Sequence, residues 1–158
     1  MKSEEKQVEW AIRGIKELEF MVNESVELDP KVDFKFTVDI TPVVEQDSIL
    51  FGITVIYVNA TKKDELLREK VMTIFSIKDM KSRTQVSSDG KPLVDLPEKL
   101  WISMFSISFT HTRALLAKSS AGTRFGQMLL PIINPEEQFR KLFGQLLQNK
   151  SEVSGKSS

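Results

Sequence analysis

The chain has 158 residues, with 22 Lys and Arg balancing 22 Asp and Glu, one His and no Cys. This length suits one domain with a real core, and the zero net charge excludes a global field that would steer the protein onto nucleic acid or an anionic membrane. The lack of cysteine excludes disulfides and zinc-thiolate sites. Residues 1–6 lack the apolar core of a signal peptide, and no apolar run reaches the length of a membrane span. We therefore expect a soluble, cytoplasmic protein that does not insert into membranes.

The first half of the chain alternates apolar and polar residues, which predicts half-buried strands. The stretch from Val32 to Ile40 alternates without a fault, and Leu18, Phe20 and Val22 follow the same period. Two later stretches, residues 49–58 and 71–77, carry apolar residues on both faces. Either both faces of the sheet are therefore covered, or one of them binds a partner. Short connections predict an antiparallel sheet of four strands. The predicted strands are Ile15 to Val22, Val32 to Ile40, Ile49 to Val58 and Val71 to Ile77.

After the polar connection from residue 81 to 95, the period changes to that of a helix. Residues 97–120 contain no breaker, although their many Ser and Thr residues leave a strand across 102–109 as an alternative. A second helix should run from Pro135 to about Asn149, because Asn134 is a good N-cap and proline fits the first helical position. The sequence thus predicts one α+β domain over residues 1–149 and a disordered polar tail over 150–158.

The segment between the two helices, residues 125–133, reads Phe-Gly-Gln-Met-Leu-Leu-Pro-Ile-Ile. Loops normally lie on the surface, so a segment this apolar must either plug the core of its own domain or offer apolar surface to another molecule. We call residues 121–134 the crossover segment.

Catalytic or metal-binding patterns are weak in this chain. His111 is the only histidine, and it has no second histidine, cysteine or tight carboxylate cluster to work with. The pair Glu136-Glu137 is explained by helix capping, and Gly122 to Gly126 lacks the lysine and spacing of a phosphate loop. We expect a protein that is not an enzyme and that needs no cofactor or metal.

The order of predicted elements and the crossover motif resemble the SecB family of export chaperones. The specific part of the likeness is an arginine at position 113, Gly122, and then Phe125, Met128, Leu129, Leu130, Pro131, Ile133 and Asn134. The chain departs from the family in having Ile132 at the second loop proline and Pro135 at the aromatic after the asparagine. The resemblance implies a four-stranded antiparallel sheet, a long helix, an apolar crossover and a shorter C-terminal helix. It also implies a dimer of dimers, and docking on the export translocase motor, which the neutral net charge does not favour.

These observations lead to three hypotheses about function. The first is a holdase that binds unfolded or precursor polypeptides, because an apolar groove with an adaptable methionine can accept many sequences. The second is a dedicated partner-binding module, such as the SecB-like chaperone of a toxin–antitoxin pair, and the third is a small-ligand carrier or an enzyme with a pocket between the sheet and the helices. The candidate client-binding residues are Phe34, Phe36, Tyr57, Phe125, Met128, Leu129 and Leu130. The candidate oligomer-interface residues are Leu18, Phe20, Ser103 and Ser106.

Overall fold

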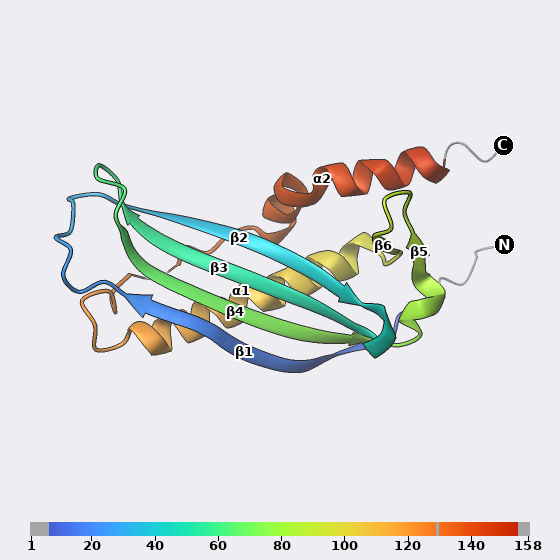
Figure 1. The fold of residues 1–158 in the computed structure, drawn as a ribbon, viewed down its shortest axis with the longest axis horizontal. Coiled ribbons are helices and arrows are strands. Elements are labelled where there is room, and N and C mark those ends of the chain that lie inside the picture. The colour runs from blue at the N-terminus through green and yellow to red at the C-terminus, as the bar shows by residue number, and fades with distance from the viewer. Residues whose placement is uncertain (1–6, 129, 155–158) are drawn as a thin grey trace.

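The computed structural model describes residues 7–128 and 130–154, with the side chains described up to residue 144. These residues form six strands and two long helices, with short 3-10 turns after β2 and β4 (Figure 1). In chain order the elements are β1 Trp10–Val22, β2 Val32–Val43, η1 Val44–Gln46, β3 Ser48–Asn59, β4 Glu65–Ile77, η2 Met80–Arg83, β5 Thr84–Val86, β6 Pro92–Val94, α1 Glu98–Ser120 and α2 Pro135–Ser154.

The four long strands form one antiparallel sheet in the order β1-β4-β3-β2, which confirms the predicted architecture. Strand β1 starts five residues before its predicted beginning, and its pairing with β4 shifts register twice, next to Arg13 and Leu18. Strand β4 starts at Glu65, ahead of the predicted Val71. Strands β1 and β2 are the two edges of the sheet.

Both helices lie on one side of this sheet, so one face is covered and the other is open (Figure 1). The covered face carries the buried side chains Ile49, Phe51, Ile53 and Val55 of β3, and Val71, Phe75 and Ile77 of β4. On the open face Leu50, Ile56, Met72 and Ile74 remain partly exposed. The two apolar faces seen in the sequence therefore have different surroundings, because the helices cover only one of them.

Helix α1 confirms the predicted helix, and the alternative of a strand across residues 102–109 is wrong. Its hydroxyl groups explain how so many Ser and Thr residues fit in a helix. Ser108 donates to the Met104 carbonyl at 2.7 Å, and Thr112 donates to the Ser108 carbonyl at 2.8 Å. Because each hydroxyl is satisfied one turn back, both side chains can be buried against the sheet.

The connection between β4 and α1 is more ordered than its polar sequence predicts. It contains η2 and the small hairpin of β5 and β6, in which Gln85 pairs with Leu93. Gly90 closes the hairpin with a φ of 81°, a conformation that favours glycine. The last helix, α2, continues to Ser154, five residues past its predicted end, while residues 155–158 of the predicted tail lie outside the described part.

Candidate functional site

One row of paired residues crosses the covered face at the end of the sheet where β1 turns into β2. Val22 of β1 pairs with Leu67 of β4, Leu67 pairs with Tyr57 of β3, and Tyr57 pairs with Phe34 of β2. The crossover segment reaches this end of the sheet, because Arg124 Nη2 donates to the Asn23 carbonyl at 2.7 Å and to the Val26 carbonyl. From there it runs along the covered face to α2 (Figure 1). The structure thus brings the crossover segment and the predicted sheet aromatics to the same face.

The crossover segment combines buried and exposed apolar side chains. Phe125 is fully buried and Leu130 is 2% exposed, so both belong to the core, whereas Met128 is partly buried against it. Ile132, two residues after Leu130, is 84% exposed. The expectation of a partly exposed wall at Phe125 and Leu130 therefore needs correction, because both side chains fill space between the sheet and the helices. Leu129 lies outside the described residues.

The three sheet aromatics differ in how far they reach the surface. Phe34 is 38% exposed on the edge strand, and its ring lies 6.4 Å from that of Tyr57. Phe36 is half-buried against Phe109 of α1, with the ring centres 5.5 Å apart. Tyr57 is buried, so it lies beneath the surface and does not form an open floor; burial also raises the pKa of its hydroxyl. Phe34 is therefore the predicted sheet residue that is most accessible to a partner.

The residues predicted for an oligomer interface lie on β1 and α1. Leu18 is exposed next to a register shift of β1, whereas Phe20 is half-buried and faces the core. Ser103 is exposed on α1 and Ser106 is partly exposed. Sequence reasoning included Ile15 in this edge strand but missed Trp10 and Ile12, whose apolar side chains are also exposed. In the sequence, apolar residues alternate with other residues as far as Ile12, but the extra residue Arg13 in β1 interrupts this alternation.

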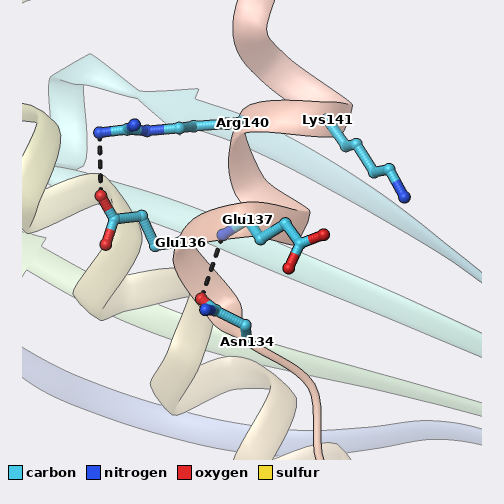
Figure 2. Close-up of a pocket in the computed structure, with 5 residues that line it drawn as sticks. All are labelled: Asn134, Glu136, Glu137, Arg140 and Lys141. Atoms are coloured by element: carbon cyan, nitrogen blue, oxygen red, sulfur yellow. Dashed lines mark hydrogen bonds and ion pairs between the residues drawn. The ribbon is translucent and has the colours of Figure 1, made fainter.

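A polar depression lies beside the first turn of α2, lined by Asn134, Glu136, Glu137, Arg140 and Lys141 (Figure 2). The Glu137 amide donates to Asn134 Oδ1 at 3.2 Å, which confirms the predicted N-cap. Arg140 forms ion pairs with Glu136 at 2.9 Å and with Glu98 of α1 at 3.1 Å. Arg140 thus links α2 to α1 and also pairs within α2.

Two titratable side chains with shifted pKa values belong to α1 and β4. His111 Nδ1 is 3.2 Å from Thr73 Oγ1, and burial lowers the pKa of the imidazole. Glu69 of β4 is fully buried, and neither of its oxygens has a hydrogen-bond partner among the described residues. Burial, and then the nearby Glu17 carboxyl, raise the pKa of Glu69 to about 9. Over residues 7–128 and 130–154, no group of three or more His, Asp or Glu side chains is placed to hold a metal ion.

The fold is similar to that of a known protein. It matches the structure of the SecB-like chaperone Rv1957 of Mycobacterium tuberculosis, in complex with a ChAD peptide from the antitoxin Rv1956 HigA1, with a match probability of 1.00 and a TM-score of 0.51. The match covers 79% of this chain and 88% of that one, at 13% sequence identity. The chain has a SecB-like fold. No protein-family model and no curated protein matches its sequence. Within the part of the chain that the structure describes, no helix is long and apolar enough to cross a membrane.

Proposed function

We propose that this protein is a SecB-like chaperone that holds unfolded or precursor polypeptides through apolar surface on the helix-covered side of its sheet. The observation that carries the proposal is the exposure of Phe34 on the edge strand and of Ile132 on the crossover segment, in a fold that Rv1957 uses in a complex with a peptide. A chaperone of this kind needs accessible apolar groups that accept many sequences, and Met128 beside the core adds an adaptable side chain.

The partner in this proposal is an extended polypeptide, and no catalytic residue or cofactor takes part. Binding is spread over many weak apolar contacts, so the affinity for any one sequence is modest. The neutral net charge does not favour the acidic docking surface that export chaperones present to the translocase motor. We therefore propose cytoplasmic holding of non-native chains, and the neutral charge gives no support to delivery through such a docking surface.

The second candidate is a dedicated chaperone for one partner, as in a toxin–antitoxin system. This candidate is favoured by the same comparison, because the bound peptide in the Rv1957 structure comes from an antitoxin. A panel of unrelated unfolded proteins separates the two. A general holdase slows the aggregation of most of them at stoichiometric amounts, whereas a dedicated chaperone slows few or none.

We also propose that the protein assembles into a dimer or tetramer. Strand β1 is a free sheet edge, and Ile12, Ile15 and Leu18 are each more than two-fifths exposed along it. Exposed apolar edge strands pair readily with other strands. Light scattering at micromolar concentration tests this, and a monodisperse monomer would count against it.

A third candidate, a small-ligand carrier or an enzyme, receives less support from the described residues. The polar depression at the start of α2 is open, and two of its four charged residues, Glu136 and Arg140, are ion-paired with each other. His111, the only histidine, bonds to a threonine of the sheet. We therefore propose a binding function without catalysis.

A further inference from the structure

Residues 121–128, the first part of the crossover segment, fold back on themselves in consecutive turns. The Thr123 amide donates to the Ser120 carbonyl at 3.0 Å, the Gly126 amide to the Thr123 carbonyl at 3.1 Å, and the Met128 amide to the Phe125 carbonyl at 2.9 Å. None of these three bonds has a partner in the sheet. The last two lie within the segment and can persist if it moves, whereas the first joins it to Ser120 at the end of α1.

The Arg124 side chain ties this segment to the turn between β1 and β2. Arg124 donates to the carbonyls of Asn23 and Val26, and its Nε lies 3.6 Å from Glu24 Oε2. Its guanidinium also stacks 4.9 Å from the centre of the Phe125 ring. Among the hydrogen bonds described for residues 121–128, those of Arg124 reach the turn between β1 and β2, and those of Thr123 reach Ser120 at the end of α1. We call the contacts of Arg124 the Arg124 latch.

The latch holds Phe125 in the core at the end of the sheet where the candidate surface lies. The turn that Arg124 contacts begins directly after Val22, and Val22 starts the row that ends at Phe34. Phe125 belongs to the same core cluster as Tyr57. An apolar side chain of the protein itself thus fills space on the face that we propose for clients.

With Phe125 in the core, several buried polar atoms near this end of the sheet have no hydrogen-bond partner among the described residues. The hydroxyls of Tyr57 and Ser120 and both oxygens of Glu69 are buried and make no hydrogen bond among the described residues. In the last turn of α1, Ser119 Oγ donates to Glu17 Oε2 at 2.7 Å. Burying unsatisfied polar groups costs free energy, which offsets the gain from burying Phe125. The latch contacts add to the burial of Phe125 in favouring the closed state.

We propose that residues 121–128 form a self-occupying plug that the Arg124 latch keeps closed, and that its opening makes the client surface fully accessible. This inference rests on the proposed function and adds its regulation. Client binding and opening are coupled, because a client that binds the open state shifts the population toward it. The affinity measured for the wild type is lower than that of the open state, because only the open fraction of the molecules binds the client.

Opening can be measured without any client, because the chain has no cysteine. Ser120→Cys is a nearly isosteric probe at a buried hydroxyl that makes no hydrogen bond, so its thiol should react slowly with a maleimide. Adding Arg124→Gln should speed this reaction about tenfold, the change that about 1.4 kcal/mol of lost stabilisation produces. Arg140→Gln is the matched control, since it removes an arginine with two ion pairs outside the latch.

A second probe separates local opening from loss of the fold. Ser108→Cys places a thiol in the buried middle of α1. Arg124→Gln should leave its labelling rate unchanged, because opening of residues 121–128 does not expose it. An unchanged rate at position 120, or an equal increase at both positions, would overturn the latch.

Binding of reduced and carboxymethylated lactalbumin, which stays unfolded, then connects the latch to function. Arg124→Gln should bind this client about tenfold more tightly than the wild type and than Arg140→Gln. Equal affinities for the three proteins, with an unchanged labelling rate, refute the latch and leave the chaperone proposal standing. Faster labelling at position 120 without client binding by any of them supports the latch and refutes the chaperone proposal.

Discussion

Replacing Glu69 with glutamine should stabilise the protein, and the gain should grow with pH. Glu69 is fully buried, and its pKa is raised from 4.5 to about 9 by burial and by the neighbouring Glu17 carboxyl. Between these two pH values the folded protein keeps a proton that the unfolded chain has lost. Folding must therefore take up a proton, and stability falls as pH rises through this window.

The size of the effect follows from the shift. Each pH unit above the unfolded pKa of 4.5 costs up to about 1.4 kcal/mol, so the cost at pH 7 reaches about 3 kcal/mol. Glutamine has nearly the same shape and stays neutral at every pH. The difference in unfolding free energy between Glu69→Gln and the wild type should thus be small at pH 5, about 3 kcal/mol at pH 7 and larger still at pH 9.

Urea unfolding followed by circular dichroism at these three pH values measures the difference directly. Glu17→Gln is the matched control, because it removes the smaller cause of the raised pKa and leaves the burial of Glu69 in place. Its stability should still fall with pH. A difference between Glu69→Gln and the wild type that stays constant from pH 5 to pH 9 would refute this account of Glu69.

Three further predictions test the packing and assembly. Leu130→Asp should lower the unfolding free energy by several kcal/mol because Leu130 is buried, whereas Ile132→Asp should change it by less than about 0.5 kcal/mol; similar thermal melting of the two variants would refute this division of the crossover segment. Asn134→Ala should cost about 1 kcal/mol in denaturant unfolding by removing the N-cap of α2, and no loss would show that this hydrogen bond is unimportant. Ile15→Lys should shift light scattering toward the monomer, and an unchanged mass would exclude the β1 edge from the interface.

The sequence predicted the central strands and the helices well because their patterns are local. Strand β2 alternates cleanly, and α1 keeps one apolar stripe despite its many hydroxyls. The start of β4 was missed because a carboxyl, Glu69, occupies a buried position where the pattern requires an apolar residue. The start of β1 was missed because the register shift at Arg13 breaks the alternation.

The candidate site was predicted less completely, because its geometry depends on contacts distant in sequence. The composition of the crossover segment indicated apolar surface or a core plug, and the structure contains both, with Phe125 inside and Ile132 outside. The neighbouring Arg124 bonds to partners that lie about a hundred residues earlier in the sequence. No local pattern in the sequence carries that information.

Binding of an unfolded client by matched surface variants tests the central claim most directly. Phe34→Asp and Ile132→Asp each place a charge on the proposed client surface, while Val86→Asp changes a side chain that is 75% exposed on the β5–β6 hairpin at the opposite end of the sheet (Figure 1). Fluorescence titration with reduced and carboxymethylated lactalbumin should show binding by the wild type and by Val86→Asp. It should show affinity reduced about tenfold or more for the other two, each folded by circular dichroism. Equal affinities for all four proteins, or no binding by the folded wild type, would contradict the account.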